Sequence, residues 1–167
     1  MTSMDFSMPS FPRLETARLL LRQETPEDAE AILAVFSDPA VTQFHDLDTF
    51  TTLKEAVGVI ERRAQRFADG RGIRWGIARK LDLVVIGSCG FRWDKPAHGA
   101  EIGYELASRF WRQGIMSEAL QAILQFGFEK MSLRFVAAEV MLDNIASKNL
   151  LKKLGFSSQG VLKQHGF

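Results

Sequence analysis

Hydrophobic residues recur at steps of three and four positions along residues 116–131, the spacing of one face of an α-helix. The residues on that face are Leu120, Ile123, Leu124, Gly127 and Met131. A strand-like stretch, residues 100–106, precedes this helix, and a short turn containing Gly114 joins the two. The pattern therefore predicts a strand, a tight turn and a long amphipathic helix, around which the other elements are arranged.

The rest of the chain alternates between the helical and the strand period. Upstream of residue 100, the pattern predicts a strand at 18–22, a helix from Thr25-Pro26 to about Phe36 and a helical turn at 39–44. A helix from Thr51 or Thr52 to Phe67 follows, and then a hairpin of strands 73–79 and 83–93. Downstream, it predicts a strand at 134–140, a helix at 144–154 and a strand at 156–163. Residues 1–12, with two prolines and no period, are predicted to be a flexible lead-in.

This order of elements predicts an α/β (α+β) fold in a single domain spanning residues 1–167. The strand–helix–strand connection from residues 100–106 to 134–140 requires a parallel pair with a right-handed crossover, whereas strands joined by short loops pair antiparallel. We expect a mixed, mostly antiparallel central sheet with helices on both faces. A ligand is expected near the carboxyl end of the 100–106 strand, beside the N-terminus of the central helix.

Composition narrows the class of protein. The 167 residues are 46% hydrophobic and 25% charged, as in ordinary globular proteins. A net charge of +1 without a strongly basic run argues against a nucleic-acid partner. No apolar run is long enough for a membrane span, no signal-peptide pattern opens the chain, and the single Cys89 excludes an internal disulfide. We expect a soluble cytoplasmic protein with no membrane partner.

The turn before the central helix has the chemistry of an anion site. The first backbone N–H groups of a helix lack carbonyl partners, and the helix dipole makes them electropositive. Gly114 removes a Cβ that would hinder an approaching anion, and Ser117 could cap the helix or donate a hydroxyl hydrogen bond. A glycine here also fits a plain tight connection, so both interpretations stand.

Other kinds of site find less support. His45, His98 and His165 are scattered, and Cys89 lies apart from them, so no metal site is predicted. His45 and His98 are interpreted as loop residues, although His98 could touch a substrate. The glycine turn matches neither a Walker-type loop nor a dinucleotide fingerprint.

Four motifs, in order and at matching spacing, resemble the GNAT-type N-acetyltransferases. They are EIGYEL at 101–106, FWRQGIMSEAL at 110–120, NIAS at 144–147 and LGF at 154–156. The branch they resemble is the RimJ/RimL-like one, whose namesakes acetylate the N-terminal amine of ribosomal proteins. Residues 14–22 also look like the first strand of that branch, so the resemblance covers roughly Leu14 to the C-terminus.

The resemblance implies a GNAT-like fold with acetyl-coenzyme A (acetyl-CoA) as co-substrate. The pyrophosphate would meet the backbone amides of Arg112, Gln113, Gly114, Ile115, Met116 and Ser117. The pantetheine arm would lie along the 100–106 strand like an added strand, contacting the Leu106 backbone and the Asn144 side chain, while the 134–140 strand splays away. The family pattern has glycine or alanine where this chain has Met116, whose side chain could point into the core.

Acyl transfer to an amine needs a group that takes a proton from the ammonium. Alternation along the 100–106 strand places Glu101 and Glu105 on one face. Glu101 is our first candidate for the base, Glu105 the second and Glu139 the third. Glu101 could instead simply pair with an arginine such as Arg92 or Arg134.

The leaving thiolate also needs a proton. Many relatives carry a tyrosine for this purpose where this chain has Leu151, so the common donor is absent. Ser147 lies one helical turn beyond Asn144 on the same side and is the candidate replacement, either positioning the sulfur or relaying a proton through water. A solvent-facing serine is the alternative.

The chain ends at Phe167, where this branch normally continues into a last strand that pairs with residues 156–163. The full product is longer, or a partner such as a second copy in a homodimer supplies the pairing, or the protein is impaired. We expect an acetyl-CoA-dependent N-acetyltransferase in which a primary amine, from a protein N-terminus or a small molecule, attacks directly within a ternary complex. The alternative is a catalytically weak coenzyme A-binding module for regulation or interaction.

Overall fold

The structure is a computed structural model that describes residues 8, 10–45, 47–93 and 99–158. Within them, six strands form one sheet in the order β1-β2-β3-β4-β5-β6. Their bounds are β1 Leu14–Glu15, β2 Leu19–Arg22, β3 Gly72–Arg79, β4 Val85–Arg92, β5 Gly99–Leu106 and β6 Phe135–Ala137. Neighbouring strands are antiparallel except β5 and β6, which are parallel. The predicted mixed, mostly antiparallel sheet is confirmed.

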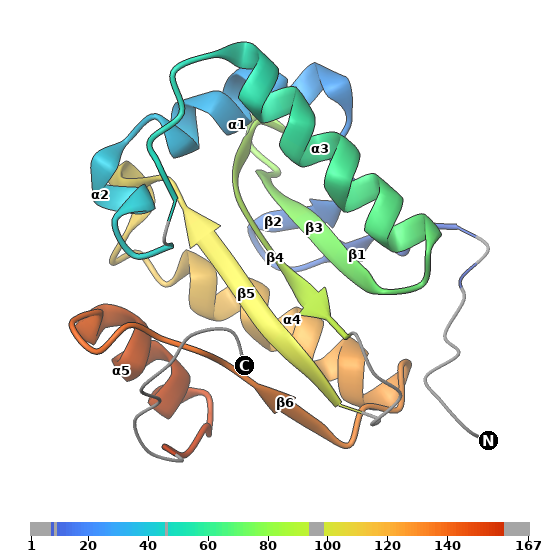
Figure 1. The fold of residues 1–167 in the computed structure, drawn as a ribbon. Helices are drawn as coiled ribbons and strands as arrows, with labels where there is room; N and C mark the ends of the chain where they lie inside the picture. The colour runs from blue at the N-terminus through green and yellow to red at the C-terminus, as the bar shows by residue number, and fades with distance from the viewer. Residues whose placement is uncertain (1–7, 9, 46, 94–98, 159–167) are drawn as a thin grey trace.

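Helices cover both faces of this sheet, as predicted. The helices are η1 Pro26–Asp28, α1 Ala29–Phe36, α2 Pro39–Thr42, α3 Leu53–Ala68, η2 Ser108–Phe110, α4 Ile115–Glu129 and α5 Ile145–Lys153. In Figure 1, α1 and α3 cross one face of the sheet, whereas α4 lies behind it. None of the helices in the described residues combines the length and hydrophobicity needed to cross a bilayer.

Side-chain alternation along β3 divides the interior into two cores. Trp75 and Ile77 point toward α4 and pack in one cluster with Leu120 and Ile123 of that helix. Ala78 belongs to a smaller cluster with residues of α1 and α3. The predicted hydrophobic face of the central helix is therefore the one that meets the sheet.

Local sequence signals set several helix ends. Thr25 and Asp28 form a capping box ahead of α1, with the Thr25 N–H donating to Asp28 Oδ2 at 2.8 Å. Thr52 and Glu55 form a second one at the start of α3. These reciprocal bonds satisfy N–H groups that a helix start leaves without partners, and they confirm both predicted starts.

Some predicted boundaries were wrong. The strand expected over residues 83–93 begins only at Val85, because Leu83 adopts a left-handed conformation (φ 62°) in the preceding turn. The strand expected over residues 134–140 is shorter, spanning Phe135–Ala137. Residues 156–158 are not in a strand, and the remainder of the strand predicted at 156–163 lies outside the described residues, as do residues 94–98 and His165.

The end of the predicted lead-in packs against the core, contrary to expectation. The Phe11 ring lies 4.9 Å from the Phe67 ring, measured between centroids. The Trp75 Nε1–H donates to the Pro12 carbonyl at 2.8 Å. Residues 1–7 and 9 of this segment lie outside the described part of the chain.

Candidate active site

Strands β5 and β6 separate after a short stretch of pairing. Their register joins Gly99 to Phe135, Ala100 to Val136 and Glu101 to Ala137. From Ile102 to Leu106, β5 has no strand partner on that edge among the described residues. The expected splay between these two parallel strands is confirmed, and it leaves a strand edge to which an extended ligand could add.

The Leu106 backbone points into this splay. The Ala107 N–H donates to the Ile86 carbonyl of the other neighbouring segment at 2.8 Å. Consecutive residues of a strand direct their backbone groups to opposite edges, so those of Leu106 face the β6 side. There the Leu106 carbonyl accepts a bond from Trp111 Nε1 at 2.8 Å, which makes the Leu106 N–H the group to consider for a ligand.

The turn before α4 presents its backbone outward. Gly114 is the N-cap residue, with a left-handed φ of 75°, and Arg112 also adopts a left-handed conformation (φ 62°). The first N–H groups of α4, at Ile115, Met116 and Ser117, have no carbonyl acceptor within the helix. No side chain caps this helix start in their place. Arg112, Gln113 and Gly114 are exposed.

Two side chains at this helix start face inward. Met116 is 8% exposed and packs in the larger core, so it contributes only backbone to the turn. The methionine that replaces the small residue of the family pattern therefore does not obstruct the turn. Ser117 is not the cap that the sequence suggested; it is buried, and its hydroxyl accepts a hydrogen bond from Gln121 Nε2 at 3.3 Å.

Arg18, which sequence reasoning treated only as part of a strand, holds the turn in place. Its Nη1 donates to the Gln113 carbonyl at 3.0 Å, and its Nε donates to Glu118 Oε1 at 2.7 Å. Its backbone N–H also donates to Glu118 Oε2 at 2.9 Å. The first part of the chain thus fixes the start of α4, and the Arg18 charge is balanced by its ion pair with Glu118.

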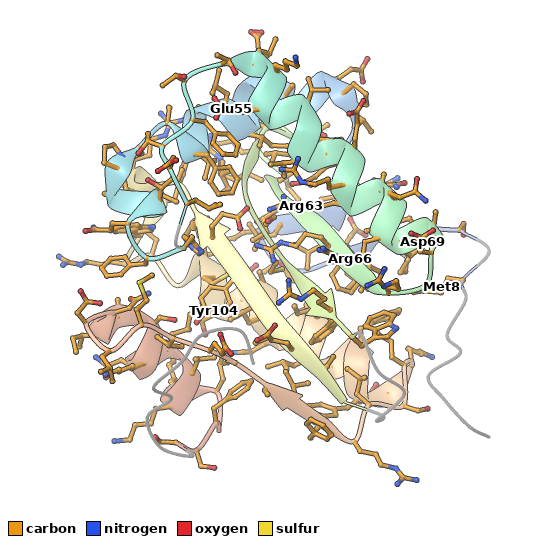
Figure 2. All side chains as sticks on the ribbon, viewed as in Figure 1. Met8, Glu55, Arg63, Arg66, Asp69 and Tyr104 are labelled. Atoms are coloured by element: carbon orange, nitrogen blue, oxygen red, sulfur yellow. The ribbon has the colours of Figure 1, made fainter. Side chains whose placement is uncertain are left out.

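Helix α5 brings Asn144 and Ser147 to the other side of the splay. Asn144 caps α5, its Oδ1 accepting the Ser147 N–H at 3.1 Å, so its amide NH₂ is the part left for a ligand. The Ser147 hydroxyl bonds the hydroxyl of Tyr104 on β5, and Figure 2 shows Tyr104 on the side of β5 toward α5. Ser147 is therefore half-buried rather than solvent-facing, and Leu151 is buried.

The sequence did not single out Tyr104 as a candidate proton donor, because an aromatic residue within a strand pattern usually indicates packing. Burial raises the pKa of Tyr104 above its usual value, and the bond to Ser147 offsets part of that effect. Its phenol therefore remains protonated at neutral pH, and the raised pKa makes it a weaker acid than an exposed tyrosine.

A cavity of about 480 Å³ lies on the opposite face of β5, between the sheet and α3. Glu101, Gly103 and Glu105 all line it, as alternation along the strand predicted. The other walls come from β3, β4, α1, α3 and the segment between α2 and α3, including Phe36, His45, Phe50, Val59, Arg62, Arg63, Arg66, Arg74 and Arg92. Strand β5 thus separates the splay from this cavity.

Glu105 is enclosed in a network of charges beneath the cavity. Its carboxylate accepts bonds from the Ser88 hydroxyl, from Arg74 and, at 3.3 Å, from Arg63. Burial would raise the pKa of Glu105, but Arg74, Arg63 and Ser88 outweigh burial and lower it to about 2. Such a carboxylate stays ionised and accepts a proton poorly, which disfavours Glu105 as a base.

Glu101 sits at a more open part of the cavity. Its Oε1 accepts a bond from Arg92 Nη2 at 2.6 Å, with the side chains 30% and 50% exposed. The pairing with Arg92 that the sequence left open is therefore present. Glu139, the third candidate base, is exposed and does not belong to the described lining of the cavity.

His45 also lines the cavity, although the sequence indicated only a loop position. Burial lowers the pKa of His45, an effect that nearby Glu105 partly opposes. The imidazole is therefore neutral at physiological pH and adds no charge to the cavity wall.

A family model described as an acetyltransferase (GNAT) domain matches residues 18–157. The chain belongs to the GNAT acetyltransferase family. This GNAT protein is 43% identical over 156 residues to the uncharacterized N-acetyltransferase YoaA of Bacillus subtilis, covering 93% of this chain and 88% of that one. It is 35% identical to the uncharacterized N-acetyltransferase p20 of Bacillus licheniformis, covering 91% and 86% of the two chains.

The GNAT fold is also that of solved structures. RimL, a ribosomal L7/L12 alpha-N-protein acetyltransferase solved in complex with coenzyme A, superposes with a TM-score of 0.82 at 24% identity, covering 93% of this chain and 90% of that one. At this identity the likeness shows the fold. Together with the family match, it confirms the resemblance stated from the four motifs, and the chain is an acetyl-CoA-dependent acetyltransferase.

Proposed function

We propose that this GNAT protein transfers the acetyl group of acetyl-CoA to a primary amine bound in the cavity beneath α3. The observation that carries the proposal is that one strand, β5, borders both the splay and the cavity. A thioester in the splay and an amine in the cavity would then meet across β5. The amine nitrogen bonds to the acetyl carbon, and the carbon–sulfur bond breaks.

The coenzyme is assigned to the splay and the α4 turn. The outward amides of residues 112–117 would hold the pyrophosphate, supported by the uncapped helix start and by the contact with Arg18 that fixes the turn. The pantetheine arm would lie along the unpaired edge of β5, within reach of the Leu106 N–H and the Asn144 amide. Met116 supports this assignment because its side chain packs away from the turn.

Glu101 is assigned as the base that takes a proton from the acceptor ammonium. It is the carboxylate of the cavity wall that remains accessible, whereas two arginines hold Glu105 ionised. Tyr104, paired with Ser147, is assigned to return a proton to the leaving thiolate, since its phenol borders the splay where the sulfur would lie. This pair would replace the donor that is missing at Leu151.

A coenzyme A-binding module without activity is the second candidate function. Leu151 favours it, since this buried leucine occupies the position of the common proton donor and cannot titrate. The two functions share the coenzyme site and differ in whether an amine is consumed.

Thiol release from acetyl-CoA with a panel of primary amines tests the proposal. We expect amine-dependent release by the wild type and a loss of roughly 10²-fold or more in kcat for Glu101→Gln. The deficit should shrink at alkaline pH, where the acceptor amine is already neutral. Glu139→Gln is the matched control and should behave as wild type. Coenzyme binding without thiol release for any amine would leave the binding module as the function.

A further inference from the structure

The side chain of Arg74 lies across the sheet from β3 to β5. Arg74 pairs with Gly90 of β4, and Gly90 pairs with Gly103 of β5, so the three residues form one row on one face of the sheet. Neither glycine has a side chain that would block the path. A Cβ added to Gly90 would lie 3.0 Å from Arg74 Cδ, and one added to Gly103 would lie 2.7 Å from Arg74 Nη1. The guanidinium of Arg74 therefore ends directly above Gly103.

Two residues of the sheet hold one edge of this guanidinium. Arg74 Nε donates to the Ser88 hydroxyl at 2.8 Å, and Arg74 Nη2 donates to the Glu105 carboxylate. Ser88 and Glu105 pair with each other in the next row of the same face. Because Nε and Nη2 lie on one edge of the planar fork, Nη1 lies on the opposite edge. That edge faces away from Glu105 and therefore toward Glu101, which lies on the other side of Gly103 along β5.

The Nη1 group of Arg74 is open to the cavity. It forms no hydrogen bond within the part of the chain that the structure describes. Among those residues, the buried side-chain polar atom left without a partner is Arg79 Nε, so the unbonded Nη1 of Arg74 is accessible rather than enclosed. Arg74 and Gly103 both line the cavity, and the Arg74 side chain is 23% exposed. The N–H donors of Nη1 therefore face the space in which the acceptor would bind.

The positive charge of Arg74 is already balanced. Arg74 and Arg63 share the carboxylate of Glu105, and Arg63 also pairs with Glu24. Two partly buried arginines thus meet two buried carboxylates. A ligand group at Nη1 gains a hydrogen-bond donor there without a net positive charge, and it lies between two glutamates of β5. This position suits a neutral oxygen, in a carbonyl or hydroxyl group, better than an anion.

Spacing along β5 relates this donor to the proposed base. Glu101 and Gly103 are two residues apart on the same face, which corresponds to roughly 6.6 Å along a strand. Two hydrogen bonds of about 2.9 Å each, joined by a molecule whose amine and oxygen are on neighbouring carbons, span such a distance. An acceptor with its amine at Glu101 can therefore place an oxygen at Arg74 Nη1.

We propose that Arg74 Nη1 donates a hydrogen bond to a neutral oxygen of the acceptor, on the carbon next to the one that carries the primary amine. The inference rests on the acetyl transfer proposed above and names the acceptor class as 2-amino carbonyl compounds and 2-amino alcohols. Gly103 leaves the space in which Nη1 and this oxygen meet, as a glycine within a strand does where a ligand approaches closely. Arg74 determines specificity in this arrangement and exchanges no proton.

Pairs of acceptors with nearly the same shape test the preference. We would compare glycinamide with isobutylamine and ethanolamine with n-propylamine, with kcat/KM expressed per concentration of neutral amine. The oxygen-bearing member of each pair should be favoured by about tenfold through a lower KM, as for one hydrogen bond to a charged donor. Because the amines also differ in reactivity, the change in this preference between protein variants is the decisive quantity.

Gly103→Ala and Arg74→Lys test the two residues. The alanine methyl group would displace Nη1, whereas lysine keeps a charge opposite Glu105 but has no second nitrogen for the acceptor. Each variant should abolish the preference by raising the KM of the oxygen-bearing amines, with the KM of isobutylamine and n-propylamine unchanged. Gly58→Ala is the matched control and should keep the preference. A Cβ there would meet Arg62 Nη1 at 3.1 Å, but Gly58 is outside the described lining of the cavity.

The outcomes separate this inference from the proposed function. No preference in the wild type, or a preference that survives in both variants, would overturn the inference while leaving the transferase intact. An equal fall of kcat for both members of each pair would also overturn it, because Arg74 would then support the fold or the chemistry rather than the acceptor. If Arg74→Lys does not fold, Gly103→Ala decides, provided that its melting temperature and coenzyme A affinity match the wild type. No thiol release with any amine would instead overturn the proposed function and this inference with it.

Discussion

Two glutamates on one face of β5 show how surroundings decide the role of a residue. Alternation places Glu101 and Glu105 in the same cavity, and both are carboxylates within one strand. Glu105 is fixed by Arg63 and Arg74, which lie 42 and 31 positions away in the sequence. Glu101 instead pairs with Arg92, whose side chain is half-exposed. The sequence predicted the pair, but the contacts that distinguish the two depend on the folded chain.

Glu105→Gln should destabilise the protein strongly at neutral pH. The change leaves two partly buried arginines without their shared carboxylate, which costs roughly 3–5 kcal/mol in the free energy of unfolding. Glu105 has a folded pKa of about 2 against 4.5 for the free group, so its ionisation stabilises the fold above pH 4.5. That contribution, on the order of 3 kcal/mol, is lost as the pH falls toward 2.

Urea unfolding of the wild type and of Glu105→Gln across pH 2–7 measures this effect. The difference in unfolding free energy between them should narrow as the medium becomes acidic. Glu101→Gln, on the same strand face with an exposed partner, should differ from wild type by less than about 1 kcal/mol at every pH. A constant gap between wild type and Glu105→Gln would contradict the role assigned to the two arginines.

Tyr104→Phe should slow the chemical step and leave binding nearly unchanged. It removes only the hydroxyl, so packing of the ring against the larger core is retained and the donor to the thiolate is lost. A thiolate is a good leaving group, so we expect a drop in kcat of about tenfold, smaller than the usual effect of removing a general acid. Steady-state kinetics should show little change in the KM for acetyl-CoA.

Ser147→Ala provides the second arm of this test. Because the two hydroxyls act through one hydrogen bond, the double variant should be no slower than the slower single variant. Multiplicative effects would show that the two side chains act independently, and wild-type kcat in both would remove them from the chemistry.

At the level of elements, the sequence predicted the features that are set by residues close to one another in the chain. The stripe of α4, the capping boxes at Thr25 and Thr52 and the turn glycine Gly114 are local signals, and all are present in the structure. Arg18 and the arginines of α3 could not be assigned, because their partners come from distant elements. For example, Arg18 and Glu118 are separated by 100 positions. The length of β6 also depended on where its neighbour separates, which no period in the sequence encodes.

Gly114→Val should weaken coenzyme binding by straining the α4 turn. Gly114 has a φ of 75°, and a β-branched residue there costs on the order of 1–2 kcal/mol. A Cβ would also lie 3.5 Å from Nη2 of Arg18, the residue that holds this turn through its bonds to Gln113 and Glu118. We expect the dissociation constant of coenzyme A, measured by calorimetry, to rise about tenfold.

Gly70→Val is the matched control for this prediction. Gly70 has a similar φ of 70° in the turn after α3, and a Cβ added to it would meet nothing within 4 Å. The strain should therefore be comparable while the coenzyme site is untouched. Equal losses of coenzyme affinity in both variants would mean that the effect comes from general destabilisation rather than from the α4 turn.

Across the whole molecule, the candidate coenzyme site joins parts that otherwise share few bonds. Three residue pairs link β6 to β5, and the Tyr104–Ser147 bond links α5 to the sheet. Figure 1 shows β6 and α5 diverging from the rest of the sheet. A ligand in the splay would bridge these two parts, so its binding should be visible as a gain in global and local stability.

Acetyl-CoA should raise the melting temperature by mass action. At a hundredfold excess over the dissociation constant the gain is about 2.7 kcal/mol, or roughly 5–10 °C for a chain of this size. Hydrogen exchange in α5 should slow at the same time, because Asn144 would be engaged by the arm. Acetyl-pantetheine, which lacks the nucleotide, should give a smaller shift, and Gly114→Val should reduce the shift with the whole coenzyme but not with this fragment. An unchanged melting temperature at millimolar acetyl-CoA would exclude coenzyme binding at this site, and with it both the transferase and the binding module.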